Sequence, residues 1–222
     1  HSSLKQVLFK RARLIGTAEN KLPRLESILH REESIKHTLV YCGDGSVDSS
    51  VSGETKRHVD ATVQMLRNEL DLDTHRFTAR ESQSKRQQLL DEFENELLQV
   101  LVAIRCLDEG VDVPATKTAY MLASSSNPRQ FVQRRGRILR PHEQKDYAVI
   151  HDFITVPQLD NNPGYLEDTE FNAERNLIQK ELKRVTMFAD AARNHPDAPI
   201  DGIPTDSTSL HEVKRKYNLL QM

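Results

Sequence analysis

Short hydrophobic runs recur along the middle of the chain, and each ends in a stretch rich in polar residues or glycine. Most of these runs are continuously apolar rather than alternating, which is typical of strands buried on both faces. Segments whose apolar residues recur every three or four positions lie between them, as in amphipathic helices. We expect strands at residues 38–42, 75–78, 100–104, 118–123 and 147–154.

Strand and helix therefore alternate at least four times between residues 38 and 154. This alternation predicts an α/β fold, with a parallel sheet covered by helices on both faces. Ligands of such sheets bind beyond the carboxyl ends of the strands. We expect a loop at 44–53 and helices at 54–70, 82–97, from 128 onwards, 166–194 and 207–222, with two helical pieces within 4–33.

The charge balance gives the 222-residue chain no overall attraction to nucleic acid. It has 31 Lys and Arg against 33 Asp and Glu, a net charge of -2, so nucleic-acid binding would need a local patch. The longest apolar run, Leu97–Ile104, is too short for a membrane span. Two cysteines without metal-ligand spacing predict buried, reduced thiols. We expect a cytoplasmic protein without a metal site or membrane contact, and we expect the fragment given by this chain to be monomeric.

The densest cluster of candidate chemistry is the segment Gln-Arg-Arg-Gly-Arg-Ile-Leu-Arg at 133–140. On a helix, Gln133, Arg137 and Arg140 share one face, since positions i, i+4 and i+7 align. Guanidinium groups match the oxygens of phosphate, and like charges this close call for an anionic partner. A generic basic helix is the alternative interpretation.

A second candidate follows the apolar strand at 100–104. Gly110 permits close backbone approach to a ligand, and Asp112 can accept hydrogen bonds from a ribose hydroxyl. An ordinary strand-to-loop turn with a capping carboxylate explains the same residues.

A third candidate joins the strand at 75–78 to the next helix. Thr78 and Arg80 precede a helix N-terminus, where a nucleic-acid phosphate could lie. A helix cap with solvated arginines is the alternative. Gly43 follows the first strand in the same way and offers backbone amides.

In this order, these segments resemble motifs IV, IVa, V and VI of superfamily 2 helicases and translocases. The resemblance covers residues 36–156 and is carried by Gly43-Asp44, His75–Arg80, Gly110-Val-Asp112 and the 133–140 segment. It is stronger to XPB-type and restriction- or defence-associated DNA helicases than to DEAD-box proteins, whose motif VI usually begins with histidine. The resemblance implies a RecA-like three-layer α/β/α lobe, the second of two.

The resemblance also implies roles for individual residues. Arg137 and Arg140 would be catalytic, facing the γ-phosphate of ATP, where arginine fingers contribute about 10³–10⁵ in rate. ATP binding would further involve Gly110, Asp112, Gln133 and Arg134, and nucleic-acid binding Gly43, Thr78, Arg80 and Arg105. Arg105 enters because Ile104 stands where many members carry a phosphate-binding hydroxyl.

The sequence contains neither a P-loop nor an Asp-Glu motif for Mg²⁺ after a strand. ATP and Mg²⁺ would therefore be held mainly by a first RecA-like lobe outside this chain. We expect the chain alone to bind neither, to hydrolyse ATP negligibly and to leave its arginines exposed. DNA, single-stranded or duplex, and the first lobe are the expected partners.

The chain begins His-Ser-Ser rather than with methionine, so we expect a tag remnant on an excised fragment. Residues 1–33 would form a helical lead-in, 34–157 the RecA-like domain and 158–222 a helical extension. Two alternatives remain: a catalytically inert nucleic-acid-binding or regulatory module with the same fold, and a phosphate-sensing domain without nucleic acid. A P-loop encoded about 150–300 residues upstream would favour the motor.

Overall fold

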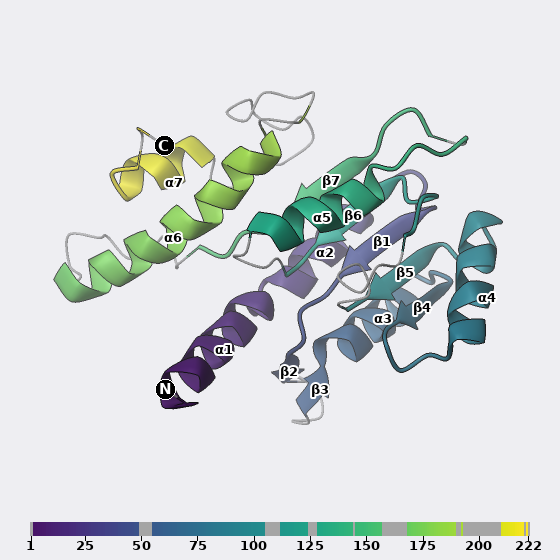
Figure 1. Ribbon diagram of the computed structural model, residues 1–222, viewed down its shortest axis with the longest axis horizontal. Coiled ribbons are helices and arrows are strands. Elements are labelled where there is room, and N and C mark those ends of the chain that lie inside the picture. The colour runs from purple at the N-terminus through teal and green to yellow at the C-terminus, as the bar shows by residue number, and fades with distance from the viewer. Residues whose placement is uncertain are drawn as a thin grey trace. The chain divides into compact units, whose positions relative to one another are not determined.

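The computed structural model folds into two compact units, His1–Phe153 and Ile154–Met222 (Figure 1). Each unit has its own set of helices and its own apolar core, which consists of two clusters in the first unit and one in the second. No helix in the described part of the chain is long and apolar enough to cross a bilayer. The structure describes residues 2–48, 55–104, 112–123, 128–143, 145–156, 168–189, 192, 210–219 and 221.

The first unit is built on a five-stranded parallel sheet in the order β4-β5-β1-β6-β7. The central strand pairs on both sides, so that Thr38 lies opposite Val100 on one side and Thr118 on the other. All five predicted strands are present, which confirms the α/β fold with a parallel sheet. The strands are β1 (Thr38–Tyr41), β4 (Thr74–Phe77), β5 (Val100–Ala103), β6 (Thr118–Met121) and β7 (Val149–Asp152).

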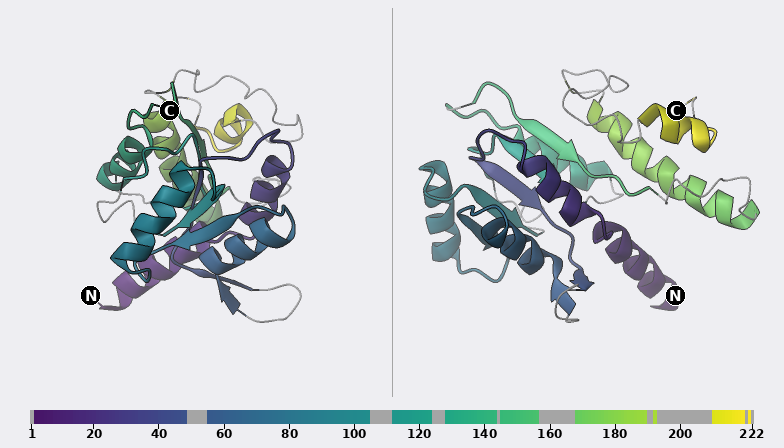
Figure 2. Two further views of the ribbon diagram at one scale, coloured as in Figure 1. Left: turned by 90° about the vertical axis from the view of Figure 1, so that its right-hand side faces the viewer. Right: turned by 180° about the vertical axis from the view of Figure 1, so that it is seen from behind.

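Alternate residues of a strand point to opposite faces of the sheet. The strands β1 and β5 are buried at every position, because helices cover both faces. Leu39 and Tyr41 of β1 belong to one apolar cluster, together with Phe93. Val40 and Cys42 belong to the other cluster. The two pairs of helices lie on opposite sides of the sheet (Figure 2). One pair is α2 (Lys21–Leu29) and α3 (His58–Asn68), and the other is α4 (Gln83–Glu94) and α5 (Pro128–Ile138).

The segment after β1 differs from the prediction of a loop followed by a helix from residue 54. It contains an antiparallel pair, β2 (Ser46–Asp48) and β3 (Thr55–Arg57), and α3 begins only at His58. Three-residue polar strands carry no recognisable hydrophobic period, so this pair was not predictable from pattern. Helix α1 (Ser2–Gly16) precedes the sheet and ends beside this segment.

The second unit contains helices α6 (Asp168–Ala189) and α7 (Leu210–Lys216). Both helices were predicted, with wider bounds. Ile178 and Leu182 of α6 pack with Val213, Tyr217 and Leu219 in a small apolar cluster. A buried ion pair between Arg184 and Glu181, with two N–O distances of 3.0 Å, lies on the same helix.

Candidate nucleotide and nucleic-acid site

Asp112 joins the two arginines that were predicted to be catalytic. Nη1 of Arg137 donates a hydrogen bond to Oδ1 of Asp112 at 3.0 Å. Nη1 of Arg140 forms an ion pair with Oδ2 of the same carboxylate. The two arginines are positioned by the end of α5, whose last residue, Ile138, is fully buried in the core. The structure thus brings the segments resembling motifs V and VI together around one carboxylate.

The exposure of the two arginines differs from our expectation that both are open to solvent. Arg140 is 55% exposed, but Arg137 is only 21% exposed. The Nε atom of Arg137 is buried and has no hydrogen-bond partner among the described residues. The expectation was therefore wrong for Arg137, because the carboxylate of Asp112 draws its guanidinium against the domain.

Arg134 and Gln133 occupy different environments on α5. Arg134 is buried, with 6% of its surface exposed, and its guanidinium lies 4.5 Å from the centroid of the Tyr41 ring. This cation–π contact helps to fasten α5 to the end of β1. Gln133 is exposed. The roles that the resemblance implies for these two residues at the nucleotide remain predictions.

Gly43 lies in a close crossing of three segments. A Cβ atom at this position would stand 3.1 Å from Cβ of Ala123 and 3.5 Å from the carbonyl oxygen of Gly16. Any larger residue would have to push Ala123 aside, because the end of α1, the loop after β1 and the segment after β6 approach one another so closely. The structure therefore gives Gly43 a packing role, and its predicted contact with nucleic acid remains a prediction.

Thr78 closes the turn between β4 and α4. Its backbone N–H and its hydroxyl both donate to Oε2 of Glu81, each at 2.7 Å, and the side chain is 6% exposed. Arg76 donates to the other oxygen of Glu81 at 3.0 Å. Burial alone would raise the pKa of Glu81, but the hydrogen bonds from Thr78 and Arg76 outweigh it, and the pKa lies below its ordinary value.

This turn matches the helix-cap alternative more closely than an open phosphate cradle. The Thr78 hydroxyl, which was predicted to bind nucleic acid, already donates its hydrogen bond to the ionised carboxylate of Glu81. A phosphate would have to displace that carboxylate. Arg80, by contrast, is exposed and directs only its backbone N–H to Thr78, at 3.2 Å. Thr78 and Arg76 are both bonded to the Glu81 carboxylate, so Arg80 is the residue of this turn best placed to reach a phosphate.

Two predicted site residues, Arg105 and Gly110, lie outside the described residues, as does Cys106. Cys42 is a free, buried thiol whose Sγ lies 3.3 Å from Oγ1 of Thr62, and burial raises its pKa to about 12. Among the described residues, no group of three or more His, Cys, Asp or Glu side chains could hold a metal ion.

Sequence reasoning missed that α1 lies beside the segment that follows the carboxyl end of β1. Lys10 and Arg13 are three positions apart on that helix and face the segment that follows β1. The signal was present in the sequence as basic residues at helical spacing. Which segment they face depends on the packing of α1, which the local pattern does not determine.

Comparison with known proteins agrees with this architecture. Residues 20–142, more than half of the chain, match the family model of the helicase conserved C-terminal domain. Over 78 residues the chain is 35% identical to the DNA 3'-5' translocase XPB2 of Sulfurisphaera tokodaii, covering 35% of this chain and 17% of that protein. Over 143 residues it is 27% identical to IRC3 of Saccharomyces cerevisiae, named as a candidate ATP-dependent helicase, covering 64% of this chain and 19% of that protein. The chain thus spans less than a fifth of the length of these two relatives.

Solved structures share the fold at low sequence identity. The yeast DEAD-box splicing factor Prp28 superimposes with a TM-score of 0.55 at 15% identity, covering 92% of this chain and 35% of that one. Prp28 from Chaetomium thermophilum, bound to ADP, gives a TM-score of 0.52 at 17% identity, covering 80% and 37%. The likeness confirms the RecA-like three-layer α/β/α fold. With the family match across the sheet and the arginine segment, it establishes that the chain belongs to the helicase conserved C-terminal domain family, the second RecA-like lobe of superfamily 2 helicases.

Proposed function

We propose that this chain is the second motor lobe of an ATP-dependent DNA helicase or translocase. One observation carries the proposal: Arg137 and Arg140 converge on the single carboxylate of Asp112. Two guanidinium groups are therefore already gathered where one anionic group can bind both. In the motor, that group is the γ-phosphate of an ATP molecule held by a first lobe.

The chemistry of the lobe follows from this arrangement. When the cleft between the lobes closes, the γ-phosphate competes with Asp112 for the arginines, because it carries more negative charge than a carboxylate. The guanidinium groups then neutralise charge that develops during phosphoryl transfer. Asp112 is a positioning residue in this scheme, and its oxygens become available to a ribose hydroxyl once the arginines move.

Gly136 supports an approach from outside the chain. A Cβ atom added at this position would meet nothing within 4 Å among the described residues. Internal packing therefore does not require glycine between Arg135 and Arg137. The open position suits a nucleotide or a neighbouring lobe that comes close to the backbone.

ATP and Mg²⁺ belong mainly to the first lobe in this proposal. The described residues offer no group of carboxylates for Mg²⁺, so no step is assigned to the metal on this chain. The chain alone is then expected to hydrolyse ATP negligibly. The similarity to XPB2, a DNA 3'-5' translocase, supports DNA as the nucleic acid. The free, buried thiol of Cys42 fits the reducing cytoplasm.

The arginines can be tested in the intact protein. Arg137→Ala and Arg140→Ala should each lower the kcat of ATP hydrolysis by about 10³–10⁵, because the transition-state charge loses a neutralising group. Nucleic-acid affinity, measured by fluorescence anisotropy, should change little. Arg86→Ala serves as the control, because it removes from another helix, α4, an arginine that is not paired with Asp112. Equal loss of ATPase and nucleic-acid binding would contradict the proposal and indicate a structural role.

A further inference from the structure

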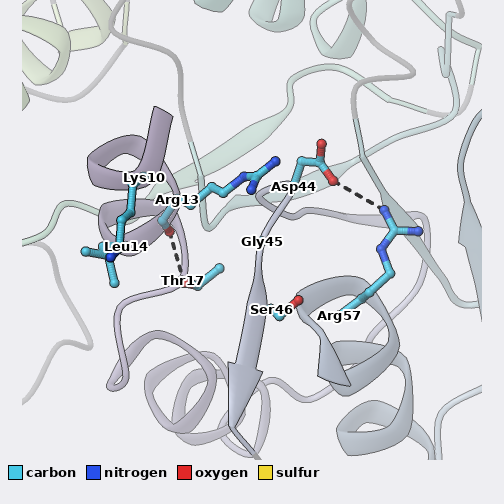
Figure 3. A pocket seen from close by; sticks show the side chains of 8 residues that line it. All are labelled: Lys10, Arg13, Leu14, Thr17, Asp44, Gly45, Ser46 and Arg57. Carbon is cyan, nitrogen blue, oxygen red and sulfur yellow. Dashed lines mark hydrogen bonds and ion pairs between the residues drawn. The ribbon is translucent and has the colours of Figure 1, made fainter. Parts of the chain in front are cut away.

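A concave pocket of about 350 Å³ lies where α1 meets the segment that follows β1 (Figure 3). Side chains reach into it from α1, from the segment between β1 and β2, and from the end of β3. None of the individual residues predicted to contact nucleotide or nucleic acid lines this pocket, although Asp44, which follows Gly43 in the segment resembling motif IV, does. The residues that matter here are Lys10, Arg13, Thr17, Asp44, Gly45 and Arg57.

The pocket carries an excess of positive charge. Three cationic side chains line it, from Lys10, Arg13 and Arg57, against the one carboxylate of Asp44. Arg57 pairs with that carboxylate, with Nη2 and Oδ1 3.3 Å apart. Neither the Lys10 ammonium nor the Arg13 guanidinium has an acidic partner among the described residues. In a chain whose net charge is -2, this local excess points to an anionic ligand.

The packing of the helix end fixes where these cations lie. Lys10, Arg13 and Thr17 all line the pocket from α1 and its C-terminal turn, and Figure 3 shows Arg13 and Thr17 on the side of the segment after β1. The Thr17 hydroxyl donates to the carbonyl oxygen of Arg13 at 2.9 Å. A Cβ atom at Gly45 would stand 2.6 Å from Cγ2 of Thr17, so the close approach depends on glycine.

The opposite wall is anchored to α3. The carbonyl oxygen of Gly45 accepts a hydrogen bond from the backbone N–H of His58 at 2.8 Å. Arg57, the residue before that helix, turns its guanidinium toward Asp44 (Figure 3). Cationic groups therefore face the pocket from both walls, which suits a tetrahedral anion with oxygens in several directions better than a planar carboxylate.

We propose that this pocket binds a phosphodiester group of the nucleic-acid strand and so extends the strand's path onto α1. The inference rests on the proposed function, because it assumes that the lobe carries part of the nucleic-acid track. Gly43 and Asp44 continue directly from β1 into the pocket wall, which places it next to a segment predicted to touch the strand. Lys10 and Arg13 supply the charge that the strand neutralises.

The test compares two double variants of the full chain with equal change in charge. Lys10→Gln with Arg13→Gln removes the pocket cations, whereas Arg11→Gln with Arg31→Gln removes two exposed cations outside the pocket. Binding of a fluorescent single strand and of a duplex is measured by anisotropy over a salt series. The pocket variant should bind about 10-fold more weakly, with a salt slope smaller by about 1, and the control should stay within about 2-fold.

Gly45→Ala provides a variant without any change in charge. Its added methyl group should push Thr17 and the end of α1 away from the segment after β1, and so weaken strand binding while thermal unfolding stays cooperative. Equal affinities of the pocket variant and its control would overturn the inference. Failure of the unaltered chain to bind either strand would instead count against the nucleic-acid part of the proposed function.

A free phosphate ion is the other source of the same chemistry. A parallel series replaces chloride by inorganic phosphate at equal ionic strength. Little change in strand binding supports a phosphodiester site. Release of the strand from the unaltered chain at low phosphate concentration, but not from the pocket variant, would overturn that assignment in favour of the free ion.

Discussion

His58 shows how far one buried residue can control stability. It begins α3, is fully buried, and neither of its ring nitrogens has a hydrogen-bond partner among the described residues. Burial, and secondly the positive charge of Lys21, lower its pKa from 6.5 to about 4. The ring is therefore neutral in the folded chain at neutral pH.

This lowered pKa predicts a loss of stability in mild acid. Between pH 7 and pH 5 the unfolded chain protonates His58 while the folded chain does not, so the free energy of unfolding falls. With a pKa of 6.5 unfolded and about 4 folded, the loss from this residue is about 2 kcal/mol at pH 5. Urea unfolding at the two pH values should show this loss, and His58→Gln should remove it.

The exposed His30 gives a matched control for that measurement. His30→Gln should retain the acid loss that His58 causes, because it leaves the buried ring of His58 in place. An unchanged pH dependence in His58→Gln would show that other groups are responsible. His151, whose pKa is also lowered by burial, is the first of these to examine.

At the scale of elements, α4 shows how a local signal becomes a defined helix start. The Ser82 hydroxyl accepts a hydrogen bond from the backbone N–H of Lys85 at 3.2 Å, which satisfies one of the free amides of the first turn. The predicted helix start at Ser82 is confirmed. The turn before it is held by Glu81, so the strand end and the helix start form one connected unit.

Removal of this cap should lower stability by a modest amount. Ser82→Ala is expected to reduce the free energy of unfolding by about 1 kcal/mol, since the amide of Lys85 loses its acceptor. Ser82→Asp should restore most of it. Ser84→Ala, two residues inside the same helix, is the control and should have a smaller effect in the same urea titration. Equal losses at both positions would show that Ser82 does not act as a cap.

At the scale of the whole molecule, the two units have separate apolar clusters. The cluster of the second unit draws all its members from residues 154–222. Packing within this cluster therefore stabilises α6 and α7 without any contribution from side chains of the five-stranded sheet. Damage to the cluster should therefore remain local, unlike damage to the core around β1.

Leu182→Ala tests this division. Leu182 is buried in the α6–α7 cluster, and loss of its side chain should cost that unit about 2–5 kcal/mol. Hydrogen exchange should accelerate in α7 and leave the amides of β1 and β5 protected. Lys183→Ala changes an exposed neighbour and should alter neither. Faster exchange in the central strands would mean that the two units fold together.

The sequence by itself determined the five strands, the flanking helices and the positions of the candidate motifs, because hydrophobic period and helix caps are set by neighbours along the chain. Tertiary structure alone decided the order of the strands and the β2–β3 pair. It also decided that Arg137 meets a carboxylate 25 residues away and that Arg134 lies buried against Tyr41. Such contacts depend on how helices pack on the sheet, and no local pattern encodes that packing.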